Sequence, residues 1–149
     1  MDPRISSKTH AVVDYLTIGT LLTLPRVLGF SRRLTDAITT LALGQLGYTL
    51  MTRHEGGVVR VLPFKAHLMM DAVGGAGLAA LPWTLGEDDD DTAKVTCAAM
   101  GAFEVIAAAM TEPRSPVEQD GWEQEERSRH RPAVSRRQRD KQPAIASRT

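Results

Sequence analysis

The sequence predicts an all-α fold: a four-helix transmembrane bundle made of two tandem two-helix repeats, followed by a disordered C-terminal tail. Three observations support this prediction. A Lys-x-His-x-x-x-Asp segment at residues 8–14 recurs without a gap 57 positions later, at residues 65–71. Four stretches poor in charge are long enough, as helices, to cross a bilayer core of about 30 Å. Residues 112–149 are polar, charged and interrupted by proline, so they cannot bury enough apolar surface to fold.

The repeat continues beyond the His segment. Each copy is followed by a Leu-Pro pair and a Leu-Gly pair in the same register, at residues 24–29 and 81–86. We therefore place the two repeats at about residues 8–53 and 65–111, which together form a membrane domain at residues 1–111. Because each repeat holds an even number of helices, both repeats would enter the membrane from the same side.

The first helix is predicted at about residues 8–28. A serine before it, Ser6 or Ser7, can accept a hydrogen bond from a free backbone N–H of the first turn. Pro25 lacks a backbone donor, so we expect a kink or a break close to the end of this helix. Gly29 then supplies a stop.

Three further helices complete the domain. The second is predicted at about residues 34–51 and the fourth at about residues 92–110, with Gly44 and Gly101 aligned at the same offset of 57. The third, at about residues 63–81, repeats the first and has a middle rich in Gly and Ala. Such small residues weaken a helix in water but are common where membrane helices approach each other.

These helices lack the polar face that a helix in water needs. Residues 37–52 and 72–86 contain no charged side chain, whereas an amphipathic helix carries a charged stripe. We therefore expect the lipid bilayer as the main partner, with a soluble four-helix bundle as the alternative. Lys and Arg are enriched on the side shared by the termini, which predicts a cytoplasmic-membrane protein with both termini in the cytoplasm. The formal net charge of zero argues against a nucleic-acid partner.

Five ionisable residues fall inside the predicted spans. In each repeat the His and the Asp are four residues apart, so they lie on one face of a helix. The fourth helix runs in the opposite direction and brings a Glu into the same layer, with Tyr48 at a similar depth. The five residues are His10, Asp14, His67, Asp71 and Glu104.

Two interpretations of this polar cluster remain open. Ionisable residues within membrane spans are candidates for function, and His and carboxylate groups are ligands of divalent transition metals or can pass a proton. The structural alternative is that they form hydrogen bonds across helices, or with nearby Lys8, Lys65 and Arg60.

The sequence contains no catalytic or cofactor motif. It has no nucleophile–base arrangement, phosphate loop or dinucleotide fingerprint. Its single cysteine, Cys97, excludes an intramolecular disulfide and a Cys-based zinc site. We therefore expect no catalytic residue and no cofactor, and the sequence gives no support for an enzyme.

The ends of the first and third helices carry a family resemblance. The segments at residues 24–30 and 81–86 resemble the SPW-repeat family of small bacterial integral membrane proteins, named for a Ser-Pro-Trp motif in the first of two membrane helices per repeat. Leucine stands in place of the serine in both segments, and Arg26 replaces the first tryptophan. The resemblance covers residues 8–111 and implies a membrane fold without implying an activity. The matching motif positions are Pro25, Pro82 and Trp83.

Together these observations favour a structural or interaction role for a small multi-pass membrane protein. Its Gly- and Ala-rich faces would associate with a second copy or with another membrane protein. The alternative is a carrier or sensor in which the polar cluster handles a proton or a divalent metal. A functional cluster requires its five side chains to converge within a few ångströms in the interior.

Overall fold

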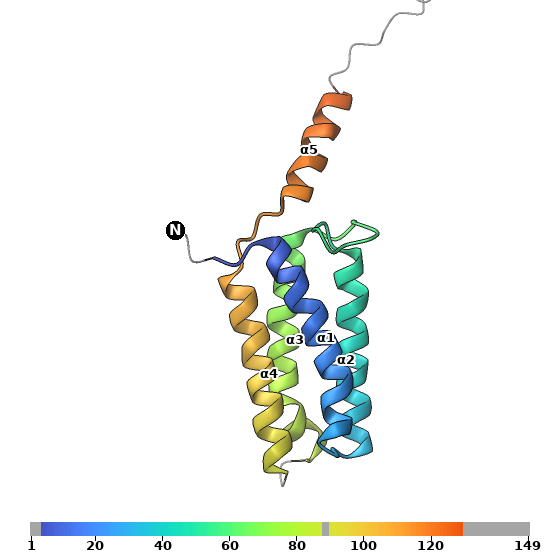
Figure 1. Ribbon diagram of the computed structural model, residues 1–149, viewed down its shortest axis with the longest axis vertical. Coiled ribbons are helices and arrows are strands. Elements are labelled where there is room, and N and C mark those ends of the chain that lie inside the picture. The colour runs from blue at the N-terminus through green and yellow to red at the C-terminus, as the bar shows by residue number, and fades with distance from the viewer. Residues whose placement is uncertain (1–3, 88–89, 130–149) are drawn as a thin grey trace, which may run out of the picture. The chain divides into compact units, whose positions relative to one another are not determined.

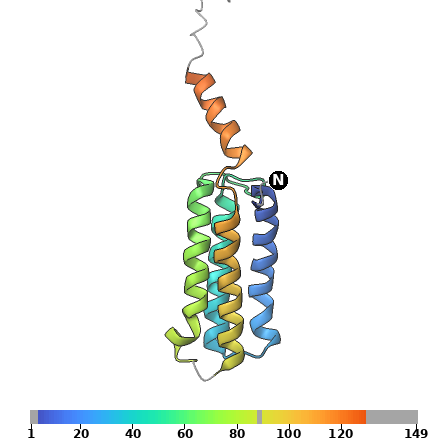
Figure 2. The same cartoon turned by 90° about the vertical axis from the view of Figure 1, so that its left-hand side faces the viewer.

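The computed structural model describes residues 4–87 and 90–129 of the 149-residue chain. Within these residues the chain is all-helical, without a strand, which confirms the predicted class. Figures 1 and 2 show the first four helices lying side by side with nearly parallel axes. The helices are α1 (Ser7–Val27), α2 (Arg32–Met51), α3 (Phe64–Leu85), α4 (Asp91–Met110) and α5 (Pro116–Arg129).

Three of the first four helices begin at a side chain that caps the first turn. Ser6 accepts a hydrogen bond from the backbone N–H of Thr9, as the sequence predicted for one of two serines. Ser31 and Asp90 cap α2 and α4 in the same way. Each cap satisfies a backbone donor that has no partner within the helix.

Pro25 and Pro82 lie within their helices, so the structure has no break at either proline, although a kink or a break was predicted at Pro25 and the end of the third helix at residue 81. α1 runs on to Val27, and α3 continues to Leu85 instead of ending at residue 81. A proline in the last turn removes only one hydrogen bond. The N–H five residues after each proline donates to the proline carbonyl, at 2.9 Å for α1 and 2.8 Å for α3, and closes the turn. Glycines with φ of 70° and 69° follow, in the left-handed backbone conformation that ends a helix.

Residues of the first helix pair match residues of the second pair at two different offsets. Residues of α1 match those of α3 at 57 positions, but the buried residues of α2 match those of α4 at 59 positions. One residue separates Gly29 from the capping Ser31, whereas three residues separate Gly86 from the capping Asp90, and these two extra residues account for the difference. Gly101 is therefore the counterpart of Ala42, and its predicted alignment with Gly44 is wrong. The buried residues of α2 are Leu34, Ile38, Ala42, Gln45 and Thr49, and their counterparts are Ala93, Cys97, Gly101, Glu104 and Ala108.

α3 and α4 touch through two glycines. A Cβ added to Gly101 would lie 2.2 Å from the carbonyl oxygen of Gly75, and one added to Gly75 would lie 2.6 Å from the carbonyl oxygen of Gly101. The close approach of the two backbones therefore requires both glycines. Their counterparts Ile18 and Ala42 carry side chains, so α1 and α2 pack less closely.

The interior has an apolar half and a polar half. Aliphatic and aromatic side chains fill the half near the α1–α2 and α3–α4 connections, and they are Leu21, Phe30, Leu34, Ile38, Ala42, Leu78, Ala93 and Cys97. The other half contains many buried polar groups, which include His10, Asp14, Thr17, Gln45, Thr49, His67, Asp71 and Glu104. Because buried polar groups cost free energy unless they are paired, we expect the polar groups in this half to bind one another or a ligand.

The tail differs in part from the prediction of disorder from residue 112 onward. Pro116–Arg129 forms α5, while residues 130–149 lie outside the described part of the chain. Proline fits the first turn of a helix because its missing N–H would have no partner there. Glu118 in the first turn and the arginines of the last turn complement the helix dipole. The chain divides into two units, residues 1–119 and 120–149, and α1 to α4 belong to the first.

Candidate metal centre

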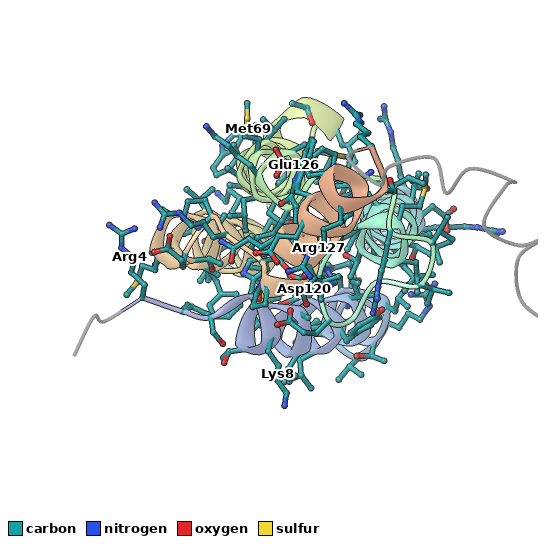
Figure 3. All side chains as sticks on the ribbon, turned by 90° about the horizontal axis from the view of Figure 1, so that it is seen from above. Arg4, Lys8, Met69, Asp120, Glu126 and Arg127 are labelled. Atoms are coloured by element: carbon teal, nitrogen blue, oxygen red, sulfur yellow. The ribbon has the colours of Figure 1, made fainter. Side chains whose placement is uncertain are left out.

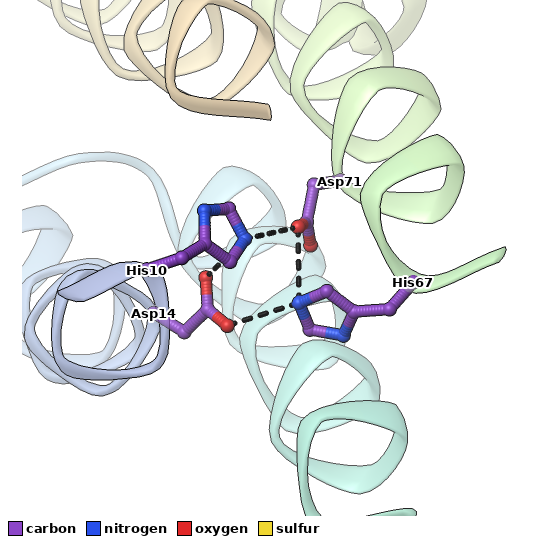
Figure 4. A group of neighbouring side chains, drawn as sticks. All are labelled: His10, Asp14, His67 and Asp71. Carbon is purple, nitrogen blue, oxygen red and sulfur yellow. Dashed lines mark hydrogen bonds and ion pairs between the residues drawn. The ribbon is translucent and has the colours of Figure 1, made fainter. Parts of the chain in front are cut away.

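Two histidines and two aspartates from α1 and α3 converge in the polar half of the interior (Figure 4). One nitrogen or oxygen atom from each residue can be chosen so that all four atoms lie within 4.8 Å of one another. The four side chains belong to residues that are at most 3% exposed. Four of the five residues selected from the sequence therefore meet, and they are His10, Asp14, His67 and Asp71.

Each imidazole Nε2 faces an aspartate on the opposite helix. His10 Nε2 lies 3.0 Å from Asp71 Oδ2, and His67 Nε2 lies 3.0 Å from Asp14 Oδ2. Each Nε2 also lies close to the aspartate one turn along its own helix, at 3.3 Å in α1 and 3.1 Å in α3. The four-residue spacing puts both side chains on one helix face, so each pair meets its counterpart directly.

A threonine holds the other nitrogen of each histidine. His10 Nδ1 lies 2.9 Å from Thr111 Oγ1, and His67 Nδ1 lies 3.0 Å from Thr52 Oγ1. Each hydroxyl donates its single hydrogen to a backbone carbonyl of its own helix, at 2.6 Å, so its oxygen accepts from the imidazole. Both histidines therefore carry a hydrogen on Nδ1 and direct Nε2 into the cluster.

Tyr48 distinguishes the two aspartates. Its hydroxyl donates to Asp71 Oδ1 at 2.7 Å. The counterpart of Tyr48 in α4 is Ala107, which offers no such donor to Asp14. The sequence predicted that Tyr48 lies at the depth of the polar cluster, and the structure shows that its hydrogen-bond partner there is Asp71.

Glu104 lies beside the four-residue cluster and not within it. Together with His10, Asp14 and Asp71 it lines a cavity of about 10 Å³. The predicted convergence of five residues therefore holds for four. Glu104 lies level with Gln45, six residues before the end of α4, and so at a depth similar to that of Asp14, as predicted.

The segment between α2 and α3 contributes a third buried histidine. The ring centroid of His54 lies 5.2 Å from that of His67 and 5.8 Å from that of Phe64. The backbone N–H of Gly56 donates to His54 Nδ1, so the neutral ring carries its hydrogen on Nε2 and has no free lone pair for a metal. Burial, reinforced by the nearby His67 and His10, lowers the pKa of His54 to about 4.

The same segment is fastened to α1. The hydroxyl of Ser7 lies within 3.0 Å of both carboxylate oxygens of Glu55, and the hydroxyl of Tyr15 donates to the carbonyl of Gly56 at 2.8 Å. A Cβ on Gly57 would lie 1.8 Å from the carbonyl oxygen of Thr52, so only glycine fits this turn. The segment is thereby held next to the histidines.

Three basic residues considered as partners of the cluster do not contact it. Lys8 points away from the helices in Figure 3 and is exposed, as is Lys65. Arg60 donates to the carbonyl of Gly57 instead. The hydrogen bonds across helices are thus made within the cluster and to the two threonines and Tyr48.

Sequence reasoning missed the threonines, Gln45 and His54. Thr52 and Thr111 are 59 positions apart, so a search at the single offset of 57 does not pair them. Once the second offset is known, a threonine at the end of the second helix of each repeat becomes a recognisable signal. His54 has no counterpart in the other repeat and carries no comparable signal.

The four residues form a group that could hold a metal ion. In a tetrahedral site with metal–ligand distances of about 2.0–2.1 Å, neighbouring ligand atoms are roughly 3.3–3.4 Å apart. The contacts between Nε2 and carboxylate oxygen atoms range from 3.0 to 3.3 Å, through one oxygen of Asp71 and both oxygens of Asp14. Because ionised carboxylate oxygens only accept hydrogen bonds, each Nε2 shares a proton with an aspartate in this arrangement. A dication bound at this position would take the place of these protons.

Comparisons of this chain with protein-family models, curated proteins and solved structures gave no match.

Proposed function

We propose that this chain is a small multi-pass protein of the cytoplasmic membrane that binds one divalent transition-metal ion, as a carrier or a sensor. The observation that carries the proposal is the convergence of two His-x-x-x-Asp pairs, with both Nε2 atoms directed inward. Imidazole and carboxylate groups suit ions such as Zn²⁺, Mn²⁺ and Fe²⁺. Two carboxylates also balance the charge of a dication, which a buried site requires. The proposed ligands are His10, Asp14, His67 and Asp71.

The apolar surface of α3 and α4 supports a surrounding bilayer. Both helices have the length and hydropathy of a membrane span, and only 28% and 33% of the residues in the two apolar stretches are buried. A core helix of a soluble protein would be mostly buried. Here large apolar side chains such as Val73 and Val95, 73% and 69% exposed, face outward.

The distribution of charge points the same way. Among the charged residues of α1 to α4, Asp14, Asp71 and Glu104 are buried, and all the others lie within the first or last two turns of a helix. α1 and α2 fall short of the hydropathy of a membrane span. Their inclusion as spans rests on their matching length beside α3 and α4, and the cytoplasmic placement of both termini rests on the distribution of Lys and Arg.

The recurrence of capping residues, terminal glycines and His contacts at offsets of 57 and 59 supports an internal duplication. Membership of the SPW-repeat family, and association with a second copy or another membrane protein, stay predictions.

A structural role is the competing proposal. The two histidines and two aspartates already satisfy one another's hydrogen bonds and tie α1 to α3. A buried polar network of this kind can fix the register of packed helices without binding anything.

Metal analysis separates the two roles. We expect the detergent-purified full chain, incubated with Zn²⁺ or Mn²⁺ and freed of excess ion, to retain about one ion per chain. A double variant, His10→Ala with His67→Ala, should retain almost none. His54→Ala is the matched control, because His54 is equally buried but offers no free lone pair, and it should retain the ion. Equal and near-zero metal in the wild type and the double variant would favour the structural role.

A further inference from the structure

The cavity of about 10 Å³ beside the cluster is the size of one water molecule. Its wall includes three of the proposed ligands, His10, Asp14 and Asp71. It also includes Gln45 and Glu104, which occupy matching positions on α2 and α4. A water molecule in this cavity would therefore lie next to both the proposed ligands and Glu104.

Glu104 brings an unsatisfied acceptor to this cavity. The residue is only 7% exposed, and its Oε1 has no hydrogen-bond partner in the described part of the chain. The amide of Gln45 bonds the same carboxyl group but leaves Oε1 without a donor. Asp14 and Asp71 cannot supply one when ionised, because they only accept. A buried oxygen in this state calls for a donor or a cation.

We propose that Glu104 is a fifth protein contributor to the metal site, acting through a water molecule that occupies this cavity and binds the ion. The inference rests on the proposed function. The bound water would coordinate the ion through its oxygen and donate a hydrogen bond to Glu104 Oε1. The set of donors then comprises two imidazoles, two aspartates and one water.

This set defines the class of ion. Five or more nitrogen and oxygen donors, rich in carboxylate, suit Mn²⁺, Fe²⁺ and Co²⁺, which readily take more than four ligands. An ion bound only by the four His and Asp side chains would be tetrahedral, as is usual for structural Zn²⁺. Glu104 therefore determines the coordination number and, through it, the preference among ions.

The pseudo-symmetry of the bundle makes Glu104 distinctive. Its counterpart is Gln45, whose amide faces the carboxyl group of Glu104. An exchange of Glu104 for glutamine would preserve the shape of the side chain and replace the acceptor Oε1 by an amide group. Glu104→Gln thus changes the proposed interaction with little change in packing.

Cobalt spectroscopy tests this proposal. Tetrahedral Co²⁺ absorbs visible light more strongly than five-coordinate Co²⁺, and far more strongly than six-coordinate Co²⁺, whose near-centrosymmetric field suppresses the transitions. We expect weak bands for the Co²⁺-loaded wild type and bands several-fold stronger for Glu104→Gln, together with a loss of Mn²⁺ affinity of about tenfold or more. Zn²⁺ affinity should change much less. Glu87→Gln, a carboxylate bonded to Ser31 at the other end of the bundle, is the control and should match the wild type.

The possible results separate this inference from the function on which it rests. Co²⁺ bound with the same spectrum in the wild type and Glu104→Gln would overturn the role of Glu104 and leave the metal site intact. Intense tetrahedral bands from the Co²⁺-loaded wild type would also overturn the role of Glu104. This result does not depend on the variant, so it counts even if Glu104→Gln fails to fold. Absence of bound Co²⁺, Mn²⁺ and Zn²⁺ in the wild type would overturn the metal site itself.

Discussion

At the scale of single residues, the position of each hydrogen decides what the polar cluster can do. The hydroxyls of Thr52 and Thr111 accept from Nδ1 of the two histidines, which leaves Nε2 as the nitrogen that faces the carboxylates. The histidines and aspartates were recognisable in the sequence because charge is rare within the helices. The threonines were not, because threonine is common throughout these helices and only the folded chain shows which ones are close.

Loss of either threonine hydroxyl should weaken metal binding. In Thr52→Val or Thr111→Val the shape of the side chain is kept, but Nδ1–H of one histidine loses its acceptor. We expect a 10- to 100-fold loss of affinity, as is typical when the group that orients a metal-bound histidine is removed. Competition against a chelator of known affinity would measure it.

Thr20→Val is the control for the threonine variants. Its hydroxyl donates only to the carbonyl of Leu16 on its own helix and is exposed. It should bind the ion as the wild type does. Affinities within threefold of the wild type for both threonine variants would contradict this assignment.

His54 should make stability depend on pH. Its pKa is lowered from 6.5 to about 4 in the folded state, so the unfolded chain binds more protons between these values. The free energy of unfolding therefore falls as the pH decreases through this window, by up to about 3 kcal/mol from this residue. In His54→Gln this part of the pH dependence should be absent.

Unfolding in detergent at pH 7 and at pH 4.5, for wild type and His54→Gln in parallel, measures this contribution. The difference between the two proteins isolates His54 from the other titrating groups. Equal loss of stability in both would show that His54 is not held neutral.

At the scale of helices, packing overrode several local signals. Pro25 predicted a kink or a break and Pro82 predicted the end of a helix, but both lie in a last turn that can lose one hydrogen bond and are buried against the core. α5 formed where composition predicted disorder, because proline and charge are placed to suit its two ends. The four long helices were predictable from the length of their uncharged stretches. The change of offset from 57 to 59 at α4 was not predictable, because it comes from the length of the preceding loop, which the helix pattern does not determine.

The contact between α3 and α4 should tolerate no added methyl group. Gly101→Ala would bring a Cβ to within 2.8 Å of the backbone nitrogen of Ala79 and closer still to the carbonyl oxygen of Gly75. We expect destabilisation by about 1–3 kcal/mol, measured as the free energy of unfolding in detergent.

Gly74→Ala serves as the matched variant in the same region. Nothing lies within 4 Å of a Cβ at this position. It should be neutral, or stabilising by up to about 1 kcal/mol, because alanine favours the helix. Similar destabilisation by both variants would show that helix propensity and not backbone contact sets the effect.

At the scale of the whole molecule, the four-helix part combines large exposed apolar side chains on α3 and α4 with an interior of which one half is polar. The exposed apolar side chains were foreseeable because the uncharged stretches have no polar stripe. For the two His-x-x-x-Asp pairs, the sequence predicted that they lie at the same depth in the bundle, but not that they touch. Whether they touch depends on how α1 and α3 pack, which single-helix periodicity does not determine.

The membrane assignment has a direct test. We expect the chain to remain in the membrane pellet after alkaline carbonate washing, because its exposed apolar surface has no counterpart in water. Reporter tags at the two ends should be accessible from the cytoplasmic side only. Recovery in the aqueous fraction would favour the soluble four-helix bundle instead.

Each helix pair contributes only half of the proposed metal ligands. His10 bonds Asp71 and Thr111, and His67 bonds Asp14 and Thr52, so each histidine makes its hydrogen bonds to residues in the other half of the chain. A polypeptide with a single helix pair would have to dimerise before it could bind the ion. Carrying both halves on one chain makes occupancy independent of protein concentration. The bound ion would stabilise the packing of the two helix pairs against each other, so removal of the ion would lower the stability of both pairs together.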